Sequence, residues 1–387
     1  MALSKIDVSN MLDETLPVAQ GGTGVTSTPF PSNYSPNLNF RNIIINGDMS
    51  IAQRGTSTAS ITTSGYYTVD RFNLGITTLG TWTQSQDTDV PTGQGFAKSL
   101  KMDCTTADGS PGSNDVLQIN YKMEGQQLQY LKKGTSSAES TTLSFWIKAT
   151  KTGTNIVELF DLDNGRQISK SYTVSSSDTW EKKTITFAGD TSGAFGNDNA
   201  ASLQLDFFFG AGSNYTSGTL NTSWNSNTTA NRAVGQVNHA DSTSNNIYIT
   251  GVQLEAGTAA SDFEFLPYDV NLNRCLRYFY NLIDRPGGDS EGYFAAGYMY
   301  SGDRLYFQIP FFVEMRATPT MSAASGTDYY TFYRDSAGDN FNEILTTQLR
   351  KNYAMLRAAD SHISGTAGQA GGVHTTSNSK VTFSAEL

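Results

Sequence analysis

The sequence predicts an all-β protein, and three observations favour that fold class. Gly, Ser, Thr and Asn are abundant, whereas only 37% of the 387 residues are hydrophobic and 16% are charged. Aromatic residues make up 11% of the chain and suit the pleated surface of strands. Runs of the strong helix formers Ala, Leu, Glu and Lys are nearly absent. Strands joined by many turns explain this composition, and the length accommodates two or three domains.

The charge balance narrows the classes of partner. The chain has a formal net charge of −10 and a pI near 4.8, so it lacks the basic surface of a nucleic-acid-binding protein. Its start has no signal-peptide pattern, and no apolar run approaches the ~20 residues of a membrane span. Cys104 and Cys275 fall in different predicted domains, which argues against a disulfide framework. We expect no nucleic-acid partner, no membrane insertion and synthesis in a cytoplasm.

Residues 1–36 are predicted to form an extended arm. Asp, Ser, Pro and Gly interrupt each short apolar stretch there, so the segment cannot bury a core of its own. Two interpretations remain open. The arm is either a flexible leader or a docking peptide that becomes ordered against a partner protein.

Residues 37–268 show the alternation of apolar and polar residues that is typical of strands. The clearest alternating stretches are 142–149, 203–209 and 247–254. Asn164-Gly165 indicates a two-residue hairpin turn, because both central positions of such a turn need positive φ. The polar stretch Gly210–Asn246 is long for a loop, which predicts an irregular strand around Trp224. The whole segment is therefore predicted to be an antiparallel β-sandwich.

A short linking helix is predicted within residues 269–285, followed by a small β-domain at 286–387. Apolar residues fall on a single helical face between Leu272 and Phe279, and Asp269 or Asn271 is the expected N-cap. The C-terminal segment alternates again at 305–313 and ends in a strand at 380–387. The stretch 341–351 fits a helix face, but its threonines favour a strand.

Several short stretches, in order along the chain, carry a family resemblance. They are Gln20–Gly24, Asn42–Gly55, Gly95–Leu100, Ala230–Asn246, Gly251–Gly257, Cys275–Phe279, Met315–Pro319 and Ala385–Leu387. Together they resemble bacteriophage tail-fibre and tail-tip virion proteins. The first stretch is similar to a Gly-rich motif of fibre N-terminal regions, the middle four to a jelly-roll domain, and the last three to a C-terminal β-domain.

The resemblance implies a carbohydrate-binding-module-like jelly roll, a homotrimer, and an arm that docks on another virion protein of the tail or an adaptor. The expected architecture is thus an N-terminal extended arm, a jelly-roll β-sandwich, a short linking helix and a small C-terminal β-domain. The candidate docking residues of the arm are Leu16, Pro17, Val18, Gln20, Gly21, Gly22 and Gly24.

We expect no metal and no cofactor. Jelly-roll modules of the resembling kind often hold Ca²⁺ between an opening Asn-Gly strand and acidic residues of the last strand, but Thr250-Gly251 stands where aspartates are expected. Asn46-Gly47 is therefore interpreted as a turn or bulge. Asp161–Gly165 begins like a calcium loop, yet its twelfth position is Tyr172 rather than Glu, which favours a hairpin.

We expect no catalytic residues and hence no enzyme. The three histidines sit in polar loops, and neither His-Glu-x-x-His nor Gly-x-Ser-x-Gly occurs. Counting does not decide whether two of the 36 acidic residues form a glycosidase pair. A polysaccharide-degrading tailspike therefore remains the enzyme alternative, although the sequence shows no β-helix repeat.

A host-surface glycan is the expected ligand. Aromatic faces bury the apolar C–H surface of a sugar while Asn, Asp and Gln bond its hydroxyls. Five aromatic residues in polar, turn-rich sequence are the candidate platform: Trp82, Trp224, Tyr66, Tyr67 and Tyr215. For each of them the competing interpretation is packing at a sandwich end or at a subunit interface.

The many aromatic residues of the C-terminal domain predict a subunit interface. Phe311 and Phe312 are adjacent in a predicted strand, so their side chains must point to opposite sides. One can face the core, and the other needs a partner subunit. Phe312 and Tyr306 are the candidate interface residues. We expect a homotrimeric tail-fibre or tail-tip subunit located in the virion, with a non-receptor-binding adaptor or decoration protein as the alternative.

Overall fold

The computed structural model describes residues 40–284, 292–358, 362–376 and 379–387. Residues 1–41 and 42–387 form separate units, and all that follows concerns the second. The predicted arm at 1–36, with its docking residues between Leu16 and Gly24, lies outside the described residues.

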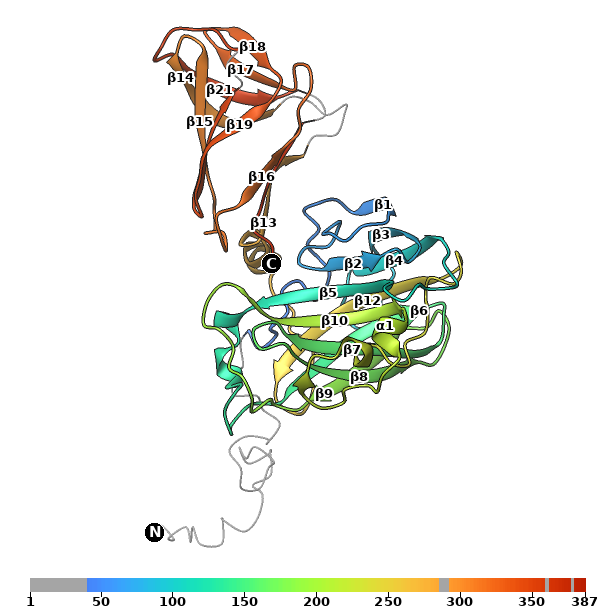
Figure 1. Cartoon of the computed structure of the whole chain (residues 1–387). Coiled ribbons are helices and arrows are strands. Elements are labelled where there is room, and N and C mark those ends of the chain that lie inside the picture. Colours follow the sequence, from blue (N-terminus) through green and yellow to red (C-terminus); the bar gives the residue numbers. More distant parts are fainter. Residues whose placement is uncertain (1–39, 285–291, 359–361, 377–378) are drawn as a thin grey trace, which may run out of the picture. The chain divides into compact units, whose positions relative to one another are not determined.

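Two antiparallel six-stranded sheets form the predicted sandwich (Figure 1). Sheet A contains, in spatial order, β1 (Ser57–Ile61), β3 (Thr81–Asp87), β4 (Ser99–Thr106), β12 (Asn246–Ala256), β6 (Thr141–Ala149) and β9 (Glu181–Phe187). Sheet B contains β11 (Asn225–Ser226), β8 (Arg166–Val174), β7 (Gly153–Asp161), β10 (Ala201–Ala211), β5 (Val116–Glu124) and β2 (Asn73–Thr77). The three strands that alternation predicted are β6, β10 and β12, and β11 confirms a strand beside Trp224.

The sandwich core follows from the alternation. Leu143, Phe145 and Ile147 of β6 are fully buried, and the Phe145 ring meets Phe207 of β10 edge-on at 5.0 Å between ring centres. Because successive strand residues point to opposite faces, Ser144 and Trp146 point away from this core. The connections carry a short helix α1 (Ser213–Thr216) and the 3-10 turns Gly125–Gln127, Gln129–Leu131 and Thr229–Asn231.

The predicted hairpin at Asn164-Gly165 exists, but its turn is longer than expected. Asp161 and Arg166 form the last cross-strand pair of β7 and β8, so four residues make the turn. Only Gly165 has positive φ, at 60°. The Asp161 carboxylate accepts the backbone N–H groups of Asp163 and Asn164 at 3.0 and 3.1 Å. These hydrogen bonds to the Asp161 side chain stabilise the turn, which therefore does not need the two residues with positive φ that the predicted turn required.

The linking helix is shorter than predicted. Helix α2 spans Tyr268–Leu276, its N-cap is Pro267 without a side-chain cap, and residues 279–284 are a strand instead. This strand, β13 (Phe279–Asp284), pairs with β22 (Lys380–Ser384), which in turn pairs with β16 (Thr320–Ala323) to form sheet C. The prediction of helix up to residue 285 was wrong because pairing with a strand about 100 residues later outweighs the local periodicity.

The C-terminal domain is built mainly on a seven-stranded antiparallel sheet, sheet D. In spatial order its strands are β18 (Ala337–Phe341), β17 (Tyr330–Arg334), β21 (Ala370–Thr375), β14 (Gly292–Ser301), β15 (Arg304–Pro310), β20 (Tyr353–Ala358) and β19 (Ile344–Leu349). The ambiguous stretch 341–351 is therefore a strand. The predicted strands near 305–313 and 380–387 are confirmed as β15 and β22. Within the described ranges, no helix has the length and apolarity to cross a membrane.

Candidate functional site

The predicted glycan platform does not assemble, and Trp82 is its clearest failure. Trp82 lies in β3 with 0% of its side chain exposed, and its Nε1 donates to the Leu79 carbonyl at 2.9 Å. A ring without exposed surface cannot stack on a ligand. The prediction was wrong because Trp82 alternates with Thr81 and Thr83, so it takes the core-facing position of its strand.

Trp224 and Tyr215 are partly buried and lie on separate elements. Trp224 packs against the sandwich core, and its Nε1 donates to the Ala188 carbonyl at 2.7 Å. Tyr215 belongs to α1 and packs against a small cluster around Phe208 on the outer side of sheet B. Both side chains are therefore engaged in packing within the sandwich, whereas the competing interpretation was packing at a sandwich end or at a subunit interface.

Tyr66 and Tyr67 lie in the connection between β1 and β2, and their hydroxyl groups are already engaged. The Tyr66 hydroxyl donates to the Leu387 carbonyl at 3.2 Å, and its ring lies 5.1 Å from the Arg54 guanidinium. The Tyr67 hydroxyl donates to the Thr63 carbonyl at 2.6 Å. The five candidates thus occupy different parts of the sandwich and form no common surface.

A pocket on the outer side of sheet A brings aromatic and polar groups together instead. Its volume is about 320 Å³, within the range of small-molecule sites, ~300–1,000 Å³. It is lined by Gly93, Gln94, Phe96, Ser144, Trp146, Lys182, Gly251, Asp262, Phe263 and Phe265. We call this set the sheet A pocket. Strands β6, β9 and β12 supply its floor, and two segments outside the strands, 93–96 and 262–265, supply its walls.

Three phenylalanines form the apolar wall. The ring centres of Phe96, Phe263 and Phe265 are 4.8–5.1 Å apart, and each pair is tilted or edge-on. Phe265 remains 49% exposed, whereas Phe96 is buried. The cluster therefore supports one aromatic ring that faces solvent. Trp146 adds a half-buried indole from the floor.

Gly251 permits this close approach. It has φ +62° at a bulge in β12, where the pairing with β6 shifts between Thr250 and Gln253. A Cβ at Gly251 would lie 2.6 Å from Cζ of Phe96 and 3.1 Å from Cδ1 of Trp146. Any side chain there would collide with rings on both sides of the pocket, so glycine is required for space as well as for backbone conformation.

Hydrogen bonds from β12 fix the wall formed by residues 261–265. The Gln253 amide donates to Ser261 Oγ at 3.1 Å and accepts the Glu264 N–H at 2.8 Å. The Glu255 carboxylate accepts the Ser261 N–H at 2.8 Å. This wall is therefore held before any ligand arrives, which reduces the entropy cost of binding.

Asp89 fixes the start of the other wall segment. It accepts from Trp180 Nε1 at 2.9 Å and forms an ion pair with Lys148, and its carbonyl accepts from Ser99 Oγ at 2.6 Å. Burial opposes ionisation of Asp89, but the hydrogen bonds from Lys148 and Trp180 outweigh it and lower the pKa. These charged and hydrogen-bonded contacts attach the loop after β3 to β4, to β6 and to the start of β9.

The polar groups of the sheet A pocket suit a polyhydroxylated ligand. Lys182 pairs across the strands with Trp146, so both side chains lie on the outer side of the sheet. Gln94 is exposed, and Ser144 and Asp262 add a hydroxyl and a carboxylate to the lining. An aromatic face beside donors and acceptors is the arrangement that binds a sugar ring.

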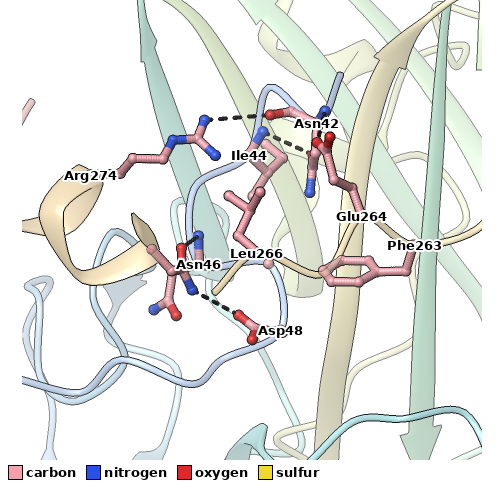
Figure 2. A pocket seen from close by; sticks show the side chains of 10 residues that line it. Asn42, Ile44, Asn46, Asp48, Phe263, Glu264, Leu266 and Arg274 are labelled. Carbon is pink, nitrogen blue, oxygen red and sulfur yellow. Dashed lines mark hydrogen bonds between the residues drawn. The ribbon is translucent and has the colours of Figure 1, made fainter. Parts of the chain in front are cut away.

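A second, much smaller pocket lies beside residues 42–48, which precede the first strand. Figure 2 shows the side chains that line it. Its volume of about 10 Å³ holds at most roughly one water. The Asn271 amide of α2 donates to Asp48 at 3.1 Å and accepts the Asn46 N–H at 3.1 Å. These contacts join the helix to the sandwich and leave no room for a ligand.

Asn46 closes a turn, in agreement with its interpretation from the sequence. It has φ +64°; its amide donates to the Ile51 and Asp70 carbonyls at 2.9 and 3.0 Å and accepts the Ile51 N–H at 2.9 Å. Both ends of the side chain are engaged by the backbone. In the part of the chain that the structure describes, no cluster of three or more His, Cys, Asp or Glu side chains could hold a metal ion.

Two buried carboxylates of sheet B have raised pKa values but no access to solvent. Glu158 and Asp206 are fully buried and share Arg232, whose Nη2 lies 2.5 and 3.2 Å from them. Burial raises the pKa of Glu158 to about 7 and raises that of Asp206, although Arg232 opposes both shifts. With no exposed surface they cannot reach a substrate. Their role is to hold the segment after α1, which carries Arg232.

The two candidate interface residues lie apart in the C-terminal domain. Phe312 is 81% exposed and Phe311 8% exposed, yet both rings approach the Tyr280 ring, at 6.1 and 5.5 Å between ring centres, so the predicted placement on opposite sides of a strand is not found. Both follow the end of β15 at Pro310 rather than lying inside a strand. Tyr306 lies within β15, is half-buried, and stacks on Tyr300 at 5.2 Å.

Sequence reasoning missed the sheet A pocket. Its aromatic residues come from three segments at least 50 residues apart, and only strand pairing brings them together. One signal was available. Phe263 and Phe265 alternate with polar residues directly after a predicted strand, and Gly251 interrupts that strand's alternation. An isolated Gly inside a strand often marks a bulge or a close approach.

Comparisons with known proteins find structural similarity only. No protein-family model and no curated protein matches the sequence. The enzymatically active domain of tailspike protein 4 from bacteriophage CBA120 aligns at 15% identity and TM-score 0.30, over 56% of this chain and 21% of that one. The chain therefore spans about a fifth of that tailspike's length.

Two further solved structures are similar over more of their own length. A putative sugar-binding protein from Bacteroides thetaiotaomicron aligns at 12% identity and TM-score 0.30, over 56% of this chain and 99% of that one. A family 11 carbohydrate-binding module from Clostridium thermocellum aligns at 10% and 0.27, over 53% and 98%. At these values the function must be argued from the site itself.

Proposed function

We propose that this protein is a non-enzymatic attachment subunit of a bacteriophage virion, a tail fibre or tail-tip protein that binds a glycan of the host surface in the sheet A pocket. The observation that carries the glycan assignment is the preformed pocket of about 320 Å³, with an exposed phenylalanine, an indole and four polar side chains. The assignment to a virion rests on the family resemblance of the sequence.

The pocket supports binding rather than cleavage. Glycosidases place two carboxylates on opposite sides of the scissile bond, at ~5–5.5 Å or ~6.5–9.5 Å. Asp262 is the only carboxylate among the ten lining residues. Purified protein should accordingly release no reducing ends from host polysaccharide, and their release would support the tailspike alternative.

The exposed ring of Phe265 gives the most direct test of the site. Phe265→Ala removes the solvent-facing aromatic and should weaken glycan binding about tenfold, since aromatic contacts contribute up to ~1.5 kcal/mol beyond area burial. Tyr268→Ala is the matched control, because Tyr268 is an exposed aromatic three residues along the chain that does not line the pocket. Binding to a polysaccharide array measures both. Equal binding by the two variants would contradict the site, and an adaptor or decoration protein should bind no glycan at all.

The proposal includes a homotrimer, for which Phe312 is the candidate contact. Phe312 is 81% exposed, whereas the aromatic residues beside it are half-exposed or buried. An exposed aromatic side chain of this kind is common at protein interfaces. Light scattering on the intact protein should give three times the chain mass of 41.9 kDa. Several weak sites on one particle would then provide avidity.

A further inference from the structure

A group of exposed tyrosines lies on one face of sheet D, in the domain that does not contain the sheet A pocket. Their side chains are 42–65% exposed, except for half-buried Tyr306. They are Tyr293, Tyr298 and Tyr300 of β14, Tyr306 of β15 and Tyr333 of β17 (strands labelled in Figure 1). The residues between them in the strands, such as Met299 and Phe307, are buried in the core. We call this side of the sheet the tyrosine face.

Three of these tyrosines form one aromatic corner. Tyr298 and Tyr306 are a cross-strand pair, with ring centres 6.3 Å apart and ring planes perpendicular. Tyr300 stacks on Tyr306 at 5.2 Å with an angle of 26°. The packing of rings on rings limits their rotation, so the corner presents aromatic surface with little conformational freedom to lose.

The other two tyrosines form a second group around His374. The rings of Tyr293 and Tyr333 lie 4.9 and 6.1 Å from the His374 ring. A Cβ on Gly372 would lie 2.2 Å from Cε1 of Tyr293, so the Tyr293 ring rests directly on the backbone of β21. Any side chain at this position would collide with the edge of the Tyr293 ring, so glycine leaves the space that the ring occupies.

The residues between the two groups are small or polar. On the outward side of the three middle strands, β21, β14 and β15, the structure places no Val, Ile or Leu. Besides the aromatics and Pro310, the outward positions are Ala296, Arg304, Gln308, Ala370 and Gly372. A protein interface of this size normally has an apolar core of larger side chains. This face suits a sugar chain better than a protein partner, because it presents aromatic rings flanked by small residues, an amide and a guanidinium.

The spacing of the groups indicates the length of the ligand. Tyr293 and Tyr298 are five residues apart in β14, or roughly 15 Å at ~3.3 Å per residue. One monosaccharide cannot contact both groups, whereas an extended oligosaccharide along the strand can.

We infer that the tyrosine face is a second carbohydrate-binding surface, which takes an extended oligosaccharide by stacking on Tyr298, Tyr300 and Tyr306 at one end and on Tyr293 at the other. It is separate in sequence and fold from the sheet A pocket, and each chain therefore carries two glycan sites. Two sites on one chain raise the effective affinity for a repeating polysaccharide without a tight single site.

The test uses the full chain and a printed array of bacterial capsular and O-antigen polysaccharides. The variant Tyr298→Ala/Tyr300→Ala removes two stacked rings and should bind its best polysaccharide at least about tenfold more weakly. Tyr298→Phe/Tyr300→Phe keeps the rings and should retain most of the binding. Tyr268→Ala is the control for loss of an exposed tyrosine. Light scattering on each variant reports the subunit number.

The outcomes separate this inference from the function proposed for the sheet A pocket. Loss of binding in the double alanine variant at unchanged mass supports the tyrosine face, whatever Phe265→Ala does. Unchanged binding in that variant, with loss in Phe265→Ala, overturns the inference alone. A fall in subunit mass shows that a second copy of the chain occupies the face, which also overturns it. A wild-type protein that binds nothing on the array contradicts both proposals.

Discussion

The sandwich and the C-terminal domain both bury aromatic rings, but they differ in the rings that stay on the surface. In the sandwich, strand aromatics such as Trp82, Phe145 and Phe187 are completely buried, as Phe332 and Phe341 are in the C-terminal domain. In the C-terminal domain several tyrosines of sheet D and Phe312 remain on the surface. Strand alternation alone does not distinguish the two, because an aromatic fits either side of a strand. Sheets A and B each bury one face against the other. The outward face of sheet D, in contrast, carries exposed aromatic rings.

The two regions also differ in buried charge. The sandwich buries carboxylates and cations, including Asp70, Arg71, Glu124, Glu158 and Asp206. Beyond residue 291, the described residues include one mostly buried carboxylate, that of Glu386, which pairs with Arg71 of the sandwich. Buried charges must be paired, and their stability depends on pH. The sandwich should therefore respond to the loss of single partners and to pH, and the C-terminal domain should not.

The largest difference is expected between a buried and an exposed aromatic. Trp82→Ala should destabilise the protein by about 3–5 kcal/mol, because it leaves a cavity in the sandwich core. Tyr300→Ala, which removes a 60% exposed ring, should cost less than about 1 kcal/mol. Urea denaturation measures both. Equal losses of unfolding free energy from the two substitutions would show that the exposure of a ring does not determine its contribution to stability.

A substitution of Arg71 should have the next largest effect. Its buried guanidinium pairs with Glu386, donates to the Lys122 carbonyl at 2.7 Å and lies 3.5 Å from the Tyr278 ring centre. Arg71→Met leaves a mostly buried carboxylate with only Arg54 at 3.1 Å, which should cost about 3 kcal/mol.

Exposed Arg304→Met serves as the control, with an expected change within about 0.5 kcal/mol. Since Glu386 follows strand β22 of the C-terminal domain, Arg71→Met should also separate the unfolding of the two regions into two transitions. A single transition with unchanged midpoint would show that this ion pair does not couple them.

Alternation predicted strands β6, β10, β12 and β15 because their inward residues are apolar in a period of two. Leu143, Phe145 and Ile147 illustrate this in the sandwich, and Leu305, Phe307 and Ile309 in sheet D. The same rule, applied to Thr81–Ser85, would have placed Trp82 in the core. The polarity of its neighbours suggested a surface loop instead, but such neighbours are ordinary on the outer side of a half-buried strand.

The sheet A pocket was not predictable in the same way. Its geometry depends on a bulge at Gly251 and on Gln253 and Glu255, whose side chains bond a later segment rather than solvent. A buried Gln and Glu in a strand give no indication of their partner from sequence alone. Pairing between distant segments is set by the tertiary structure, and local patterns do not encode it.

The pH dependence of the sandwich should be at most comparable to the two effects above. The pKa of Glu158 is raised to about 7, above its unfolded value of about 4.5, because the carboxylate is buried. A raised folded pKa gives stability that is fully present below pH ~4.5 and is lost as pH rises through ~7. At ~1.4 kcal/mol per pKa unit, the loss amounts to at most about 3.5 kcal/mol.

Glu158→Gln should reduce this slope, to which Asp206 with its raised pKa also contributes, and unfolding free energies between pH 4.5 and 8 measure the change. Exposed Glu343→Gln, in the C-terminal domain, should leave the slope unchanged. Identical pH profiles for the wild type and Glu158→Gln would mean that Arg232 keeps the carboxylate ionised throughout.

The smallest effect on stability is expected at Phe312. Phe312 and its neighbour Phe311 repeat, in two adjacent residues, the comparison between an exposed and a buried aromatic ring. Phe311 packs on Phe383 at 4.9 Å between ring centres, whereas Phe312 is 81% exposed and only approaches Tyr280 at 6.1 Å. Phe312→Ser should therefore change the unfolding free energy of the isolated chain by about 0.5 kcal/mol or less. If Phe312 lies in a trimer interface, the same substitution should lower the mass measured by light scattering toward 41.9 kDa. An unchanged trimer would remove Phe312 from the interface, and a wild-type monomer would refute the trimer itself.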